Sequence, residues 1–197
     1  AADVAYYEQT GLPVPDELDD WGSWQLVGFA GDVYALPRTT AVEDAADYYE
    51  FMMRYDPSAQ KWQRVDFPGE AVLKQAGLET GAVADGTAAT LDGDLMVLLS
   101  DVNGIGSLFR YTVEGAWEPV GIQTGIAENN AGWGTLASDG EALYLFGGLA
   151  VNQQMQAVGD CPYIYRIDPS TPTMDRVGRM VTGRVRPQVS FGNDAFL

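Results

Sequence analysis

One pattern recurs three times in this chain at a constant spacing of 56 residues, and it is marked by Arg54, Arg110 and Arg166. Each copy has an apolar and aromatic run around the arginine, then a turn rich in Asp, Pro, Ser or Gly, then a second run that opens on a large apolar residue. Alternating apolar runs separated by such turns are typical of β-hairpins. The repeat therefore predicts the same hairpin three times.

A second hairpin precedes each of these, with a Gly or Asp-Gly turn leading into an apolar strand. These turns lie near Gly31, Asp92, Asp139 and Gly192. Two hairpins in series make a unit of four strands in about fifty residues. We expect an all-β repeat protein with an N-terminal segment at 1–22, units at 23–68, 69–121 and 122–178, and the start of a fourth unit at 179–197. A weak helical pattern covers residues 40–53.

Composition excludes several classes of function. With 28 acidic and 11 basic residues the net charge is −17, so the chain offers no basic patch for nucleic acid. Histidine is absent and Cys161 is the one cysteine, which excludes His-based triads, zinc clusters and internal disulfides. We expect no metal, no cofactor and no catalytic residue. No apolar run approaches the roughly 20 residues of a membrane span.

The third unit resembles the Kelch repeat, because its apolar strand ends in a double glycine and a Tyr follows on the next long strand. The matching residues are Gly147, Gly148 and Tyr165, and the Tyr-Trp part of the motif is carried by Tyr55 with Trp62 and by Tyr111 with Trp117. The earlier units lack the double glycine, and Met174 stands where the third unit should have Trp. The resemblance implies a Kelch-like β-propeller of four-stranded antiparallel blades. It also implies that Trp62, Trp117 and Met174 pack between blades.

Three blades and the start of a fourth are fewer than the four to eight that usually close a propeller. We therefore expect an incomplete propeller or a fragment of a longer chain, closed by further blades or by a partner segment. A small four-bladed ring completed by residues 1–22 is the alternative. The repeated arginines are expected to form structural salt bridges.

Strand order predicts where a ligand would bind. In an antiparallel four-stranded unit the short turns share one end, so the long connections between strands two and three, and between units, share the other. Polar and aromatic residues of these connections are the predicted ligand-binding set: Arg38, Asp47, Tyr48, Glu128, Asn129, Asn130, Trp133, Asn152, Gln153, Asp160, Arg184 and Arg186. Amides, carboxylates and aromatic planes suit a peptide or a sugar, and they are equally typical of solvated loops.

These features favour a non-catalytic module that binds protein or glycan, within a larger surface or secreted bacterial protein; a cytoplasmic adaptor is the alternative location. Kelch-like families also include sugar oxidases and sialic acid isomerases. That resemblance implies a rival hypothesis, a sugar-active enzyme in which Arg184 and Arg186 clamp a carboxylate, although the two arginines also suit a structural role. An architectural spacer is a third hypothesis.

Overall fold

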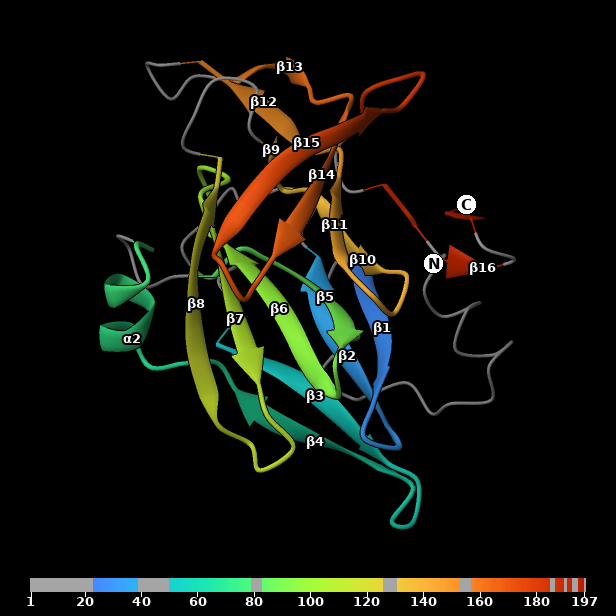
Figure 1. Cartoon of the computed structure of the whole chain (residues 1–197). Helices are drawn as coiled ribbons and strands as arrows, with labels where there is room; N and C mark the ends of the chain where they lie inside the picture. The colour runs from blue at the N-terminus through green and yellow to red at the C-terminus, as the bar shows by residue number, and fades with distance from the viewer. Residues whose placement is uncertain are drawn as a thin grey trace.

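The computed structural model shows an all-β chain built from antiparallel strands (Figure 1). It describes residues 23–38, 50–78, 83–125, 131–152, 157–184, 187–189, 191–192 and 195–196. Within these ranges one short helix occurs, α2 (Glu70–Gln75). No helix in them has the length and apolar character needed to cross a lipid bilayer.

Three units of four strands follow one another, and inside each unit the strands pair in chain order. The first unit consists of β1 (Ser23–Phe29), β2 (Asp32–Arg38), β3 (Phe51–Asp56) and β4 (Lys61–Asp66). The second consists of β5 (Asp85–Leu91), β6 (Asp94–Ser100), β7 (Gly106–Tyr111) and β8 (Trp117–Thr124). The third consists of β10 (Thr135–Ser138), β11 (Leu143–Phe146), β14 (Tyr163–Asp168) and β15 (Thr173–Arg179).

The arginine of the repeat occupies the same register position in every unit. On the third strand of each unit it lies directly opposite a second-strand residue, in the pairs Tyr34–Arg54, Met96–Arg110 and Tyr144–Arg166. The strand pairing therefore repeats every 56 residues, as the sequence pattern does.

Smaller elements fill the connections. A three-stranded sheet joins β9 (Ala131–Gly132), β12 (Leu149–Val151) and β13 (Ala157–Asp160). Near the end of the chain, β16 (Phe191–Gly192) pairs with β17 (Ala195–Phe196). Phe196 packs edge-to-face on Tyr144 and Phe146, with ring centroids 5.0 and 4.9 Å away. This hairpin therefore lies against the third unit.

The units bury their sheet faces against one another. Successive residues of a strand point to opposite faces, so Leu95 and Val97 of β6 face the first unit while Met96 and Leu98 face the third. This explains why the β6 run is apolar at every position, as expected for a strand covered on both sides. Two of the three buried clusters consequently lie in the interfaces between units, and the third, Ala35 with Phe51 and Met53, lies within the first unit.

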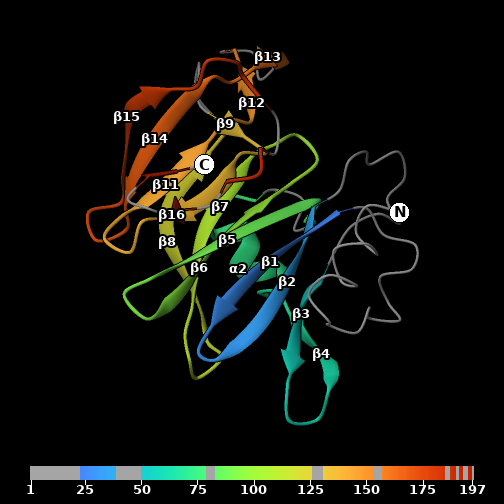
Figure 2. The ribbon, with the colours of Figure 1, turned by 90° about the vertical axis from the view of Figure 1, so that its right-hand side faces the viewer.

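The first strands of the three units lie side by side, as the blue β1 and green β5 show in Figure 2. The Gln25 amide on β1 donates to the Ala88 carbonyl (3.0 Å) and accepts from the Thr87 hydroxyl (2.6 Å). Thr87 Oγ1 in turn accepts the Leu136 N–H of β10 at 3.0 Å. These two side chains thus join the first strands of all three units, of which the first two share one eight-stranded sheet through the pairing of β2 with β5.

The connections divide between two ends of the molecule. We call the end that holds the turns 30–31, 92–93 and 139–142 the short-turn end; the other, with the connections between units, is the long-connection end. Asp92 (φ 53°) and Gly93 (φ 84°) both have left-handed backbone, which a two-residue hairpin turn requires. Of the predicted helix at 40–53, residues 51–53 form the start of β3 and residue 50 has no regular structure, whereas 40–49 lie outside the described residues.

Candidate functional site

Arg38 lies at the end of β2, where it is only 6% exposed. Its Nε is 3.2 Å from Asp85 Oδ1, and its terminal nitrogens donate to Thr135 Oγ1 and the Gly134 carbonyl, both at 3.2 Å. These partners come from the second unit and from the start of the third. Arg38 therefore joins all three units, and its role as a ligand-binding residue stays a prediction.

Trp133 is the aromatic residue of the predicted site, in the connection between β9 and β10. Its backbone is left-handed (φ 50°), a conformation that bulky side chains rarely adopt. Its indole Nε1 donates to the Asp101 carbonyl at 3.0 Å, and its ring lies over Gly104. The indole is half-buried, so part of its surface faces solvent at the long-connection end.

Several glycines pack backbone against backbone around Trp133. We call this set the glycine junction; its members are Gly104, Gly125, Gly132, Gly134, Gly147 and Gly148. A Cβ at Gly148 would overlap the Gly132 carbonyl, and one at Gly147 would overlap the Arg184 carbonyl. The double glycine of the third unit is thus required by the close approach of two other chain segments.

Two more residues of the predicted set, Asp160 and Arg184, lie at or near the glycine junction through backbone contacts. The Gly148 N–H donates to the Arg184 carbonyl at 2.6 Å, and Gly183 packs closely on Asp160. The side chains of Asp160 and Arg184 are both exposed. Asn152 follows β12, which pairs with β9. Arg38, Trp133, Asp160 and Arg184 therefore share one end of the molecule, as strand order predicts.

The other members of the predicted set lie outside the described residues. They are Asp47, Tyr48, Glu128, Asn129, Asn130, Gln153 and Arg186. Their role in ligand binding stays a prediction.

The described part of the chain shows no group of three His, Cys, Asp or Glu side chains that could hold a metal ion. Cys161 is fully buried, and burial raises the pKa of its thiol, so the protonated form is favoured. The Cys161 thiol is therefore poorly suited to act as a nucleophile. What the described part of the long-connection end offers is a set of closely packed glycine backbones beside the half-buried Trp133.

The repeated arginines form ion pairs inside their own units. Arg54 pairs with Asp32 at 2.6 Å, and Arg110 lies 3.2 Å from Asp94. The hydrogen bond that Arg54 donates to the Asp32 carboxylate raises the pKa of the arginine. The third unit has Ala142 at the position of these aspartates, and Arg166 has no ion pair with another described residue.

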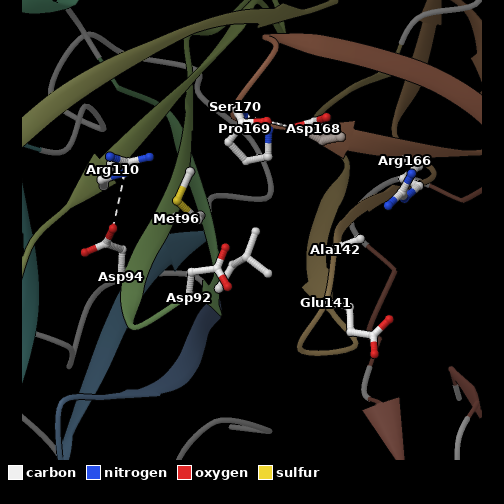
Figure 3. A pocket seen from close by; sticks show the side chains of 12 residues that line it. Asp92, Asp94, Met96, Arg110, Glu141, Ala142, Arg166, Asp168, Pro169 and Ser170 are labelled. Atoms are coloured by element: carbon white, nitrogen blue, oxygen red, sulfur yellow. Dashed lines mark hydrogen bonds and ion pairs between the residues drawn. The ribbon is translucent and has the colours of Figure 1, made fainter.

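A hollow of about 280 Å³ lies at the short-turn end, between the second and third units (Figure 3). Figure 3 shows Asp92 from the β5–β6 turn on one side and Glu141 from the β10–β11 turn on the other. From the sequence, the Asp-Gly residues of these turns are expected to be turn formers only. The signal for the hollow is the register of the turns at Gly31, Asp92 and Asp139, which lie at the same end of each unit.

One turn aspartate is used internally. Asp139 accepts hydrogen bonds from the N–H groups of Glu141 (2.9 Å) and Ala142 (2.8 Å). Burial alone would raise the pKa of Asp139, but these hydrogen bonds outweigh it and lower the pKa below its usual value. This carboxylate shapes its own turn.

Comparison with known proteins gives a fold and no family. No protein-family model matches the chain, and no curated protein matches it. The solved structure of YjhT aligns with a TM-score of 0.54 at 13% sequence identity, over 90% of this chain and 61% of that one. At this identity the likeness concerns the fold alone. The chain spans about three fifths of the length of YjhT.

Proposed function

We propose that this chain is a Kelch-like propeller module that binds a peptide or glycan, without catalysing a reaction, at the long-connection end around Trp133. In this proposal it belongs to a larger surface or secreted protein. Further blades or a partner segment close the propeller.

The backbone of Trp133 is the observation that carries the proposal. A left-handed conformation costs a non-glycine residue about 1–2 kcal/mol, and Gly132 and Gly134 on either side would both adopt it more readily. Strain of this kind is concentrated at binding sites, where it fixes a side chain in advance. Here it fixes an indole whose N–H is held by the Asp101 carbonyl.

The surroundings of Trp133 suit a ligand with both apolar and polar groups. An aromatic ring supplies a large contact surface at low entropic cost, which favours stacking with a sugar ring or a peptide side chain. The glycine junction beside it is closely packed, because the backbone contacts leave no room for side chains. A rigid support reduces the entropy lost on binding.

The scaffold supports the same proposal. Three units of the same strand order, with the arginine in the same register and the first strands side by side, are what a propeller requires. Binding at the end that holds the long connections is common on such scaffolds.

The test is a screen of the protein against glycan and peptide arrays, followed by tryptophan fluorescence titration with the best ligand. Trp133→Ala should weaken binding by about tenfold or more, the range of a buried aromatic contact at an interface. Trp133→Phe should retain part of the affinity, because it keeps an aromatic ring.

Trp62→Ala is the matched control, since Trp62 is also half-buried but packs on Tyr55 in its own unit, with ring centroids 5.3 Å apart. It should leave the affinity unchanged. Equal weakening by both variants, no ligand on either array, or turnover of a sugar by the protein would each overturn the proposal.

A further inference from the structure

A second hollow of about 690 Å³ at the short-turn end is lined by residues of the first and second units and by Gly140 of the third. Both hollows are lined by Leu91 and Asp92, so they adjoin at this turn, and we call them together the turn groove. Its floor in the smaller hollow is apolar, because Leu91, Met96 and Ile167 are all buried there. The turn groove therefore runs along turns of all three units and has an apolar base in its smaller hollow.

The rim of the groove is acidic. Four acidic residues and two arginines line the smaller hollow, so acidic residues are in excess. Arg110 is neutralised within the second unit, since it lies 3.2 Å from Asp94 and 3.7 Å from Glu118. Asp168 accepts hydrogen bonds from the Ser170 N–H and hydroxyl, which lower the pKa of Asp168 and keep it ionised.

Arg166 does not cancel the negative charge. It is next to Ile167 on β14, and neighbouring residues of a strand point to opposite faces. Ile167 packs into the interface with the second unit, so the Arg166 side chain points away from it, on the face of Tyr144 and Phe196. The charge that faces a ligand in the hollow is negative.

Asp92 and Glu141 stand out within this rim. Both are exposed, and neither makes an ion pair or a side-chain hydrogen bond with another residue in the described part of the chain. Unlike Asp139 and Asp168, neither carboxylate accepts a hydrogen bond from its own turn. These two carboxylates therefore line the hollow without an ion-pair partner among the described residues.

We infer that the turn groove binds a basic peptide segment of a partner protein, with a Lys or Arg side chain entering the hollow between the second and third units. Its charged end lies between Asp92 and Glu141, and its methylene stem packs on Leu91, Met96 and Ile167, since long basic side chains bury their stems on apolar surface. The net charge of −17 speeds the encounter with a basic partner by long-range attraction.

Fluorescence anisotropy with labelled hexalysine tests this inference, with hexaglutamate as the opposite probe. The double variant Asp92→Asn with Glu141→Gln should weaken hexalysine binding about fivefold, as expected for two exposed ion pairs. Asn also tolerates the left-handed backbone of position 92, so the turn is kept. Hexaglutamate should not bind.

The matched control is Glu114→Gln with Asp175→Asn, which removes the same charge from two exposed positions outside the groove. It should change the affinity less than twofold. Equal weakening by both double variants would show attraction to the net charge alone and would overturn the inference, as would the absence of hexalysine binding.

Amide chemical shifts give a second readout that does not depend on variants. Hexalysine should shift the N–H signals of Gly93 and Gly140, which lie in the turns beside the groove. Shifts confined to other residues would place the peptide elsewhere and refute the assignment. Trp133→Ala should leave these shifts unchanged, so the outcome is independent of the proposed function.

Discussion

At the scale of residues, the ion pair of Arg38 with Asp85 is the most deeply buried ion pair in the described part of the chain, and Arg38 also bonds to the third unit. Its side chains are 7% and 1% exposed, and the arginine also donates to two groups at the start of the third unit. A charge so placed is stable only because its partners replace water. The contrast is Arg64, whose ion pairs with Asp66 and Glu50 lie at the surface.

Asp85→Asn should therefore lower the free energy of unfolding by about 3 kcal/mol, because it breaks an ion pair whose two side chains are both buried. Arg64→Gln, which breaks two exposed pairs, should cost less than about 1 kcal/mol. Urea denaturation measures both. Similar losses for the two variants would contradict the structural role of Arg38.

Between elements, the glycine junction is the place where strand connections meet. Gly148 has φ 103° and its Cα faces the Gly132 carbonyl, whereas Gly93 has φ 84° with open space where a Cβ would lie. Both positions have the positive φ that favours glycine, but only Gly148 lies against another segment of the chain.

We expect Gly93→Ala to cost about 1 kcal/mol, from the left-handed backbone alone. Gly148→Ala should cost about 1–3 kcal/mol more, because the added methyl group must displace the Gly132 backbone. Thermal unfolding monitored by circular dichroism would measure the difference. If the two variants unfold at the same temperature, the close approach of Gly148 to the Gly132 backbone does not affect stability.

The sequence was sufficient for the strands and turns of the repeat, because alternation and turn residues are local signals that recur around Arg54, Arg110 and Arg166. It missed α2, whose six residues are too few to show helical periodicity, and the sheet of β9, β12 and β13, which depends on pairing between distant connections. The burial of Arg38 could not be predicted from the sequence either, since its partner Asp85 is 47 residues away along the chain.

For the whole molecule, the interfaces between units contain buried tyrosines. Tyr34 and Tyr111 pack together between the first and second units with ring centroids 6.0 Å apart, and Tyr165 lies between the second and third. Burial raises the pKa of all three phenols above the usual value of 10.

A raised pKa favours the neutral phenol in the folded state, so its stabilisation is complete below pH 10 and is lost as the pH rises above that value. The free energy of unfolding should therefore fall steadily above pH 10. Tyr111→Phe should flatten this fall, because it removes one of the three groups. Urea denaturation between pH 8 and pH 11 would measure it, and a stability unchanged over that range would contradict the burial of these phenols.

The hydrogen bonds that Gln25 and Thr87 make between units also affect the order in which the chain folds. Strand pairing within a unit joins neighbours along the chain, whereas the bonds of Gln25 to Ala88 and of Leu136 to Thr87 span 63 and 49 residues. Contacts between neighbours form faster, because they close shorter loops. During synthesis from the N-terminus, the first unit can form before β5 has left the ribosome. Gln25 gains its partners only when the second unit packs against the first.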